Sequence, residues 1–149
     1  NNLRNIMLHS YSKIWLHIIW STKSKQRIIQ GERRTLIYNF LIEKAIEIKV
    51  PIEVLNIQPE HIHLLIDLPT DISVSKFVKN LKGSSSRWIN EKKLFKGHFE
   101  WQRGYGVFSV SPSLLIKVKT YIKNQDEHHK RMSYKNELNT LLKKTNSIK

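Results

Sequence analysis

The clearest strand pattern in the chain is His61-Ile62-His63-Leu64-Leu65-Ile66-Asp67-Leu68, and the fold prediction rests on it. Apolar side chains occupy every even position, so we predict a β-strand with one continuous apolar face. His61 and His63 share the opposite face, about 6.5–7 Å apart at Cα. Imidazole is the commonest protein metal ligand, and two rings at this spacing can converge on one divalent cation. A His-x-His pair on a strand is often only solvent-facing, so the pattern alone leaves both interpretations open.

Alternation and helical periodicity predict further elements on both sides of this strand. We predict strands at 13–20 and 52–57, short strands at 99–101 and 105–110, and helices at 32–49, 73–90 and from 111 to about 125. The order β-α-β-β-α-β, with one extra strand and helix, predicts an α+β fold: a ferredoxin-like (RRM-like) antiparallel sheet with helices on one face and a C-terminal catalytic helix. The other face would be open for a ligand.

Length and composition narrow the classes of protein. The 149 residues fit one domain, with a core at about 11–129 and a basic, weakly helical tail at 130–149. No apolar run approaches the roughly 18 residues of a membrane span. Residues 1–7 hold no long apolar segment, so we expect no secretory signal there, and Met7 is a candidate start. Cysteine is absent, which excludes disulfides and thiolate zinc sites.

Charge points to a polyanionic partner. Lysine and arginine number 26 against 12 acidic residues, a formal net charge of +14. Such a field attracts nucleic acid, and phosphate neutralisation releases counterions. Two other interpretations stay open: a basic protein whose charge only keeps it in solution, and binding to a membrane surface. The chain has no phosphate-binding Gly-x-x-x-x-Gly-Lys loop. Its carboxylates are few and scattered along the sequence, so the histidine pair is the only metal-binding site that we predict.

A second constellation lies on the last predicted helix. Tyr121 and Gln125 are four residues apart and project from the same helix face. A phenol can act as a nucleophile, and a glutamine carbonyl is a hard oxygen ligand of the kind that magnesium and manganese accept. Tyr121 also borders an apolar stripe, where tyrosine is more often a packing residue. His128 and His129 follow by one turn, and His17 on the first strand borders the same region.

Basic and hydroxyl side chains outside the apolar stripes are candidate phosphate contacts. The predicted DNA-binding residues lie on the 73–90 helix, in the following hairpin and on the last helix: Lys76, Lys79, Lys82, Ser84, Arg87, Arg103 and Lys117. For each of them, the simpler interpretation is an ordinary surface residue in contact with solvent. Trp101, near Arg103 in the sequence, has two possible roles: stacking on an unpaired base or packing in the protein core.

Several of these stretches, in this order, resemble one known family, the TnpA-type single-tyrosine HUH transposases of the IS-two-hundred / IS-six-hundred-and-five insertion-sequence family. The resemblance runs from about residue 11 to 136. It rests on the first strand at 17–23, the HUH motif (histidine, hydrophobic, histidine) at 59–65, the next helix at 73–85, the late hairpin at 101–105 and the catalytic helix at 121–125.

The resemblance implies a metal-dependent DNA transposase. His61, His63 and Gln125 would hold Mg²⁺ or Mn²⁺, and Tyr121 would attack the scissile phosphate, leaving a 5′-phosphotyrosine and a free 3′-hydroxyl. The substrate would be single-stranded DNA with hairpin ends. The enzyme would be a homodimer whose tyrosine helix can act in trans, working on nucleoid DNA in the prokaryotic cytoplasm.

Other functions stay open. A non-catalytic or domesticated nucleic-acid-binding protein of the same fold would keep the basic surface without needing Tyr121, His61 or His63. A replication initiator or relaxase also uses an HUH site, but the further motifs of a larger chain are absent. A histidine zinc hydrolase lacks the His-Glu-x-x-His pattern. The basic tail after Gln125 carries no motif that matches the family.

Overall fold

The computed structural model describes residues 10–146, with side chains described through residue 144. The candidate start at Met7 lies outside the described residues. Among the helices of residues 10–146, none is both long enough and apolar enough to cross a membrane.

Four antiparallel strands form one sheet in the order β2-β3-β1-β4. Their bounds are β1 Trp15–Ser21, β2 Ile52–Ile57, β3 His61–Asp67 and β4 Gly106–Ser109. The 52–57 prediction matches β2 at both ends, and β3 is one residue shorter than predicted. Each strand of the central pair β1 and β3 has a neighbour on both sides, and this order is the ferredoxin-like one that the sequence predicted.

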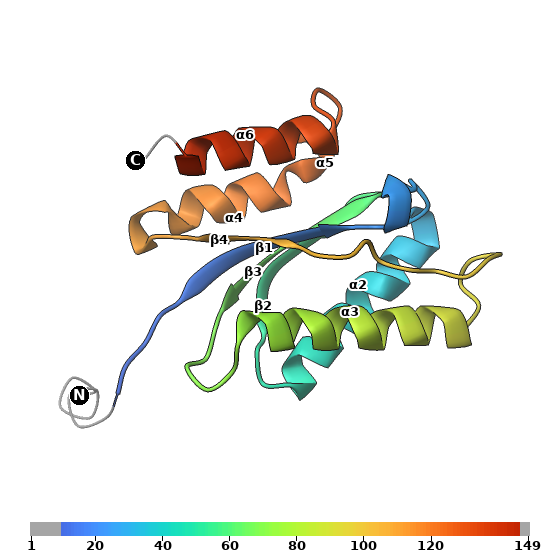
Figure 1. Ribbon diagram of the computed structural model, residues 1–149, viewed down its shortest axis with the longest axis horizontal. Helices are drawn as coiled ribbons and strands as arrows, with labels where there is room; N and C mark the ends of the chain where they lie inside the picture. Colours follow the sequence, from blue (N-terminus) through green and yellow to red (C-terminus); the bar gives the residue numbers. More distant parts are fainter. Residues whose placement is uncertain (1–9, 147–149) are drawn as a thin grey trace.

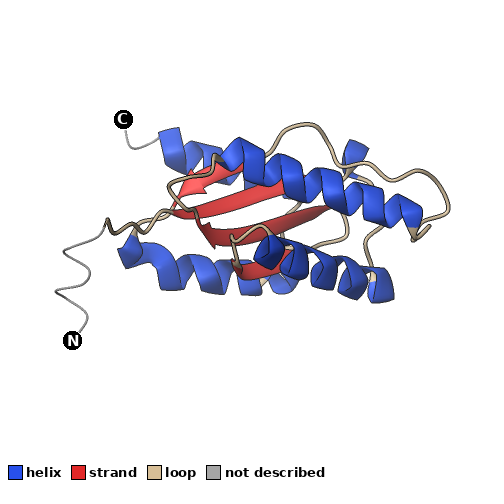
Figure 2. Ribbon diagram, turned by 90° about the horizontal axis from the view of Figure 1, so that it is seen from below, coloured by secondary structure: helices blue, strands red, loops and turns tan. Residues whose placement is uncertain are grey.

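Two long helices cover one face of the sheet (Figures 1 and 2). They are α2, Gly31–Glu47, and α3, Val74–Glu91, both within two residues of the predicted bounds. On α2, the buried residues Ile37, Leu41 and Ala45 recur every fourth position, which places them on one stripe. The start of α3 is capped by Ser73, whose side chain accepts a hydrogen bond of 3.1 Å from the backbone N–H of Lys76. Such a cap satisfies one of the otherwise unpaired amides of a first turn.

The apolar face of β3 packs under these helices, as the alternation predicted. Ile62, Leu64 and Ile66 are each 0% exposed and belong to the main hydrophobic core. Burying a side chain of this size contributes about 1.5–3 kcal/mol relative to leaving it exposed. This row therefore fixes which face of β3 turns inward, and it sends the histidines to the other face.

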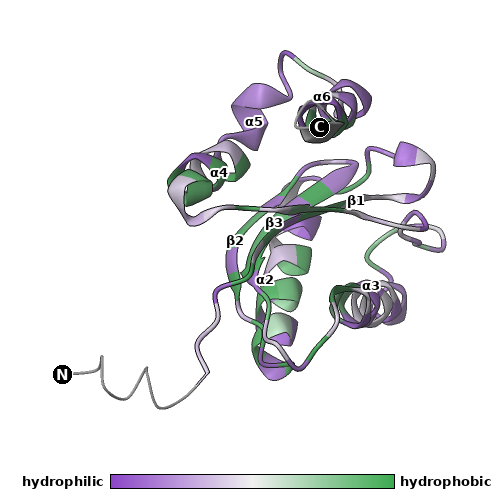
Figure 3. Ribbon diagram, turned by 60° about the vertical axis from the view of Figure 1, so that its left-hand side comes forward, coloured by the Kyte–Doolittle hydropathy of each residue, from purple (hydrophilic) through white to green (hydrophobic). Residues whose placement is uncertain are grey.

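The other face is covered rather than open (Figures 1 and 3). Three helices lie over it: α4 Leu115–Lys123, α5 Gln125–His128 and α6 Tyr134–Asn146. Ile122 of α4 joins Leu65, Val54 and Val110 in a second hydrophobic cluster. The prediction of an open face was wrong because the chain after β4 folds back and buries the apolar side of α4 on the sheet.

The predicted helix from 111 to about 125 is not continuous. It starts as a short 3-10 helix, Pro112–Leu114, and becomes α4. Asn124 then leaves helical geometry at φ −93° and ψ 18°, and α5 begins at Gln125. This break lies between Tyr121 and Gln125, the two residues that the sequence placed on one helix face.

The predicted strand at 99–101 was also wrong. Only Trp101 makes a β-bridge, to Thr22. The backbone N–H and C=O of Phe99 are bonded instead by the Asn90 side chain, at 2.8 and 3.0 Å. Trp101 is a core residue, because it is 8% exposed and its Nε1–H donates to Ser85 Oγ at 2.9 Å. Its role in the core decides the question that the sequence left open.

Candidate functional site

The two histidines of β3 lie side by side beneath α4–α6, as the strand prediction required. His61 and His63 are both 0% exposed, and their ring centroids are 5.0 Å apart. On the neighbouring strand, His17 places its Nε2 2.8 Å from Nδ1 of His63. His17 therefore borders the site and can hold the His63 ring in one orientation, leaving Nε2 of His63 directed away from the sheet.

His61 is held in a similar way by a carboxylate. Its Nδ1 lies 2.6 Å from Oε1 of Glu60, the residue before it in the chain. Arg27 forms an ion pair with the other oxygen of Glu60. A carboxylate that accepts from Nδ1–H selects the tautomer whose Nε2 carries a lone pair, which is how metal-binding histidines are commonly oriented.

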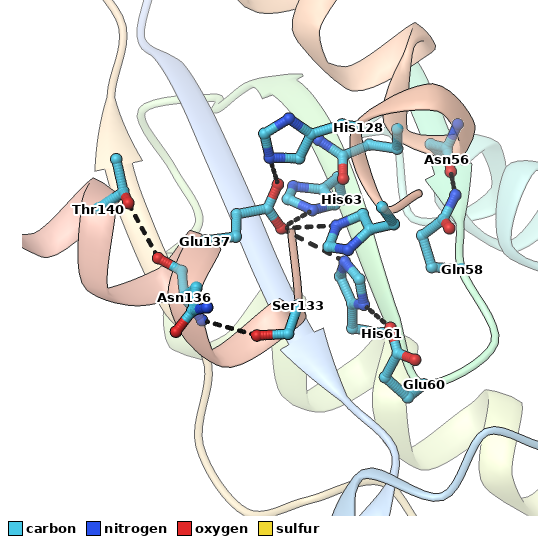
Figure 4. A network of polar contacts seen from close by, with 12 residues as sticks. Asn56, Gln58, Glu60, His61, His63, His128, Ser133, Asn136, Glu137 and Thr140 are labelled. Carbon is cyan, nitrogen blue, oxygen red and sulfur yellow. Dashed lines mark hydrogen bonds and ion pairs between the residues drawn. The ribbon is translucent and has the colours of Figure 1, made fainter. Parts of the chain in front are cut away.

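The centre of the site is occupied by Glu137 of α6 (Figure 4). Its Oε1 lies 2.9 Å from Nε2 of His63 and 3.0 Å from Nε2 of His129. Its Oε2 accepts a hydrogen bond from the Tyr121 hydroxyl. The sequence predicted no carboxylate at the histidine pair, and α6 brings one there from 74 residues along the chain.

A sequence signal for Glu137 existed but was weak. Glu137 shares the buried side of α6 with the partly buried Tyr134, Leu138 and Leu141, at helical spacing. A charged residue on the apolar stripe of a helix is rarely buried unless it has partners. The sequence cannot name those partners, since they come from β3, from α4, from α5 and from the turn after α5.

Tyr121 lies at the edge of the same cluster. Its ring centroid is 6.0 Å from that of His63 and 6.1 Å from that of His17. Burial and the neighbouring Glu137 carboxylate raise the pKa of Tyr121 above its usual value. Tyr121 also lines a cavity of about 600 Å³ between β4 and α4 that includes Lys117. The Tyr121 side chain thus borders this cavity, and its hydroxyl is hydrogen-bonded to Glu137.

Gln125 is fully buried at the start of α5. Its Nε2 donates to the backbone carbonyl of Tyr121 at 3.3 Å. Its Oε1 is buried and has no hydrogen-bond partner among the described residues. One turn later in the chain, the ring of His129 lies 4.5 Å from that of His61.

The donor atoms of this cluster fit a divalent cation. Besides Gln125 Oε1, Nε2 of His61 is buried without a hydrogen bond within the described part of the chain, although Glu137 Oε1 lies 3.4 Å away. Buried polar atoms without partners are costly, and a bound ion would satisfy them. His61, His63, His129 and Glu137 each offer one ligand atom, all within 4.8 Å of one another.

The protonation states suit metal binding. Burial lowers the pKa of His63 to about 4 and that of His17 to about 3, so both rings are neutral near pH 7. Burial alone would also lower the pKa of His61, but the Glu137 and Glu60 carboxylates outweigh it, and the pKa is raised. A cation between these groups would replace the proton that this arrangement favours on His61.

The predicted DNA-binding residues do not form one cluster. Lys79, Lys82 and Arg103 line a cavity of about 630 Å³ between α3 and residues 100–105. The Nζ of Lys82 donates to the carbonyls of Gln102 and Gly104 at 2.7 and 2.8 Å, and burial lowers its pKa. Lys82 thereby fixes the loop that carries Arg103.

The remaining candidates are spread more widely. Lys76 and Arg87 are exposed on α3. The hydroxyl of Ser84 donates to the Asn80 carbonyl at 2.6 Å, within the same helix. Lys117 is exposed near Tyr121.

Comparison with known proteins identifies the family. The family described as "Transposase IS200 like" matches residues 10–125, well over half of the chain. This chain belongs to the IS200-like transposase family. The ISDra2 transposase TnpA of Deinococcus radiodurans is 26% identical to it over 117 residues, covering 74% of this chain and 83% of that protein. The transposase for insertion sequence element IS200 of Salmonella typhimurium is 32% identical over 119 residues, covering 76% and 78%.

Solved structures agree with the family assignment. A crystal structure from Deinococcus radiodurans R1, provisionally assigned as a transposase, superposes with a TM-score of 0.64 at 28% identity, covering 78% of this chain and 95% of that one. A REP-associated tyrosine transposase bound to a REP hairpin has the same fold, with a TM-score of 0.63 at 15% identity and coverage of 81% and 72%.

The family match ends at Gln125. It therefore includes β3, α4 and Tyr121 but not His129 or Glu137. In this IS200-like transposase, two of the side chains around the histidine pair come from a segment beyond the matched region. The site described above is thus partly built from the basic tail whose role the sequence left open.

Proposed function

We propose that this transposase cleaves and rejoins single-stranded DNA at insertion-sequence ends through a covalent bond to Tyr121. One observation carries the proposal: the Tyr121 hydroxyl and Nε2 of His63 bond to the two oxygens of the same carboxylate, Glu137. A nucleophile and a metal ligand that contact the same carboxylate lie close enough together to act on one phosphate.

The chemistry is a transesterification. The Tyr121 oxygen bonds to phosphorus as the bond from phosphorus to the 3′ oxygen breaks, which leaves a 5′-phosphotyrosine and a 3′-hydroxyl. The phenol proton has an acceptor in place, since Glu137 already receives its hydrogen bond. Attack by another 3′-hydroxyl reverses the step and rejoins strands. The phosphate ester bond is conserved throughout, so no nucleotide hydrolysis is required.

His61, His63 and Gln125 would hold the divalent ion, which we expect to be Mg²⁺ or Mn²⁺. When bound, it would neutralise charge on the scissile phosphate. The support is that two of the four buried side-chain atoms without hydrogen bonds in the described residues are His61 Nε2 and Gln125 Oε1. The chain itself orients these ligands, because Glu60 and His17 bond to the far nitrogens of the two rings.

We infer that hairpin DNA binds beside α3, in the cavity lined by Lys79, Arg103 and Tyr105. Cationic side chains there can contact phosphates, and an exposed aromatic ring can stack on an unpaired base. Lys76, Lys82, Ser84, Arg87 and Lys117 are further candidates from the sequence. A tyrosine transposase of the same fold was solved with a DNA hairpin, which supports this kind of partner.

We further infer a homodimer whose tyrosine helix can act in trans, at work on nucleoid DNA in a prokaryotic cytoplasm. β4 is an edge strand, and Val107 on it is 38% exposed. Nearby Leu114 and Ile116 are 48% and 79% exposed, which is a feature of association surfaces. Mixing Tyr121→Phe with His61→Ala chains tests the arrangement. If cleavage is recovered in the mixture, the tyrosine of one subunit must act at the histidine site of the other. If cleavage is not recovered, each active site takes its tyrosine and its histidines from the same chain.

Covalent capture tests the nucleophile. The chain is incubated with a single-stranded end hairpin and Mn²⁺ or Mg²⁺, and the adduct is resolved after denaturation. We expect an adduct with the wild type, none with Tyr121→Phe, and wild-type yield with Tyr38→Phe, an exposed tyrosine on α2. Equal adduct from Tyr121→Phe and the wild type contradicts the assignment.

The metal ligand is tested separately. His61→Ala should abolish cleavage while DNA binding, measured by fluorescence anisotropy, stays within about threefold, because phosphate contacts dominate that affinity. Unchanged cleavage would exclude His61 as an essential ligand. Binding by the wild type should also weaken steeply with salt, and a flat response would contradict binding through phosphates.

A further inference from the structure

The most informative feature outside the family-matched region is Glu137. It is 1% exposed, and three histidine Nε2 atoms surround its Oε1 at 2.9 Å (His63), 3.0 Å (His129) and 3.4 Å (His61), as Figure 4 shows in part. Three imidazoles converging on one point is an arrangement typical of a metal site. In the described chain, a carboxylate oxygen lies at that point.

We propose that His129 and Glu137 join His61 and His63 as metal ligands, so that this transposase carries a three-histidine, one-carboxylate site. It rests on the proposed function only in sharing His61 and His63. The ligand atoms all lie within 4.8 Å of one another. Ligands about 2.0–2.2 Å from a shared ion lie up to roughly 4 Å apart, so small side-chain shifts suffice. Glu137 has a flexible side chain and needs to withdraw by about one such bond length.

The surroundings of these ligands are built to orient them. Glu60 is bonded to Nδ1 of His61, and His17 to Nδ1 of His63, so both rings present Nε2 to the same point. Glu137 starts from a fixed position, since Oε2 accepts from Tyr121 and α6 is held on the sheet face. Such supporting contacts commonly change metal affinity by about 10–100-fold.

The ligand chemistry predicts which ions bind. Imidazole nitrogens suit first-row transition ions, whereas Mg²⁺ prefers oxygen ligands and keeps several waters. A set of three nitrogens and one carboxylate should therefore prefer Zn²⁺, Co²⁺ or Mn²⁺ over Mg²⁺. Two histidines with Gln125, the set of the proposed function, discriminate less because they supply one nitrogen fewer.

A direct binding measurement tests the ligand set without relying on activity. The full chain is stripped with a chelator and titrated with Co²⁺, whose visible absorption reports the number and type of its ligands. Zn²⁺, Mn²⁺ and Mg²⁺ then compete for the site. We expect Glu137→Ala and His129→Ala each to weaken Co²⁺ affinity at least about tenfold and to shift the absorption band, because each removes a ligand.

Matched controls isolate the ligands. Glu127→Ala removes an exposed carboxylate of the same segment, which bonds only to Lys130 among the described residues, and His98→Ala removes an exposed imidazole. Both should bind Co²⁺ like the wild type. Glu137→Asp keeps the carboxylate and should recover part of the affinity. Circular dichroism checks that each variant is folded. If Glu137→Ala does not fold, Glu137→Asp still tests the role of the carboxylate.

The outcomes separate this proposal from the proposed function. Wild-type Co²⁺ affinity and spectrum in Glu137→Ala and His129→Ala would overturn the four-ligand set, as would Mg²⁺ displacing Co²⁺ at equal concentration. Tyr121→Phe should bind Co²⁺ normally and form no adduct. If the wild type binds Co²⁺ as predicted but gives no adduct, the nucleophile assignment fails and the metal site stands.

Discussion

The two faces of the sheet are stabilised by different means, although the same strand, β3, contributes to both. On the α2–α3 face, eighteen buried apolar residues form one core, whereas the α4–α6 face has a buried apolar cluster of four. The second face buries polar side chains instead, including His17, His61, His63, Gln125 and Glu137.

One face therefore provides stability, and the other provides the groups for chemistry. Apolar burial supplies free energy without direction, so the first face tolerates no large loss of volume but needs no special geometry. Buried polar groups cost free energy unless each finds a partner. The second face accepts that cost in exchange for orienting histidines, a carboxylate and a phenol around one point.

The largest effect should come from the apolar face. Leu64→Ala removes a fully buried side chain beneath α2 and α3 and should lower the free energy of unfolding by about 2–5 kcal/mol. Urea denaturation followed by circular dichroism measures it. The control Ile46→Ala, 60% exposed on α2, should change stability by no more than about 0.5 kcal/mol. If the free energy of unfolding falls no more in Leu64→Ala than in the control, the stability of the core does not depend on the inward-facing residues of β3.

On the polar face, affinity should change more than stability. Glu60→Ala removes the carboxylate that holds His61 Nδ1 and should weaken metal binding by about 10–100-fold. Isothermal titration with Mn²⁺ measures this effect. Glu91→Ala, which removes an exposed carboxylate at the end of α3, serves as the control. If both variants bind Mn²⁺ equally, Glu60 does not orient the ligand.

Hydrogen exchange compares the helices of the two faces directly. Five residues of α3 are buried, whereas Glu137 is the one buried side chain on α6 within residues 134–144. Helices with few buried apolar contacts open locally at lower free energy. We expect α6 amides to exchange at least about tenfold faster than α3 amides, measured by mass spectrometry at pH 7, and metal binding to slow α6 selectively. Equal protection of α3 and α6 would contradict this ranking.

The smallest effect should come from a surface ion pair beside the polar face. Lys119 of α4 lies 2.8 Å from Glu53 of β2, and both side chains are partly exposed. Such pairs contribute about 0–1 kcal/mol. Lys119→Met should therefore leave both stability and adduct yield within experimental error of the wild type. A loss above about 2 kcal/mol would show that the pair, rather than packing of Ile122, holds α4 on the sheet.

Most of the sheet could be predicted from the sequence, because local alternation sets the face of each side chain. The period-two pattern of β3 correctly separated Ile62 and Leu64 from His61 and His63. The 99–101 strand failed for a non-local reason, since the Asn90 side chain took the backbone bonds of Phe99. The break at Asn124 likewise lacks a proline or glycine that would have signalled it.

Local patterns along the chain were enough to predict the ferredoxin-like order, the inward row of β3, the pairing of His61 with His63 and the strong positive charge. In contrast, the covering of the histidines by α4–α6 and the approach of Glu137 follow from the packing of separate elements. Periodicity is a property of neighbouring residues, so it can be read along the chain. The meeting of Glu137 with His63, across 74 positions, depends on how separate elements pack, which no local pattern records.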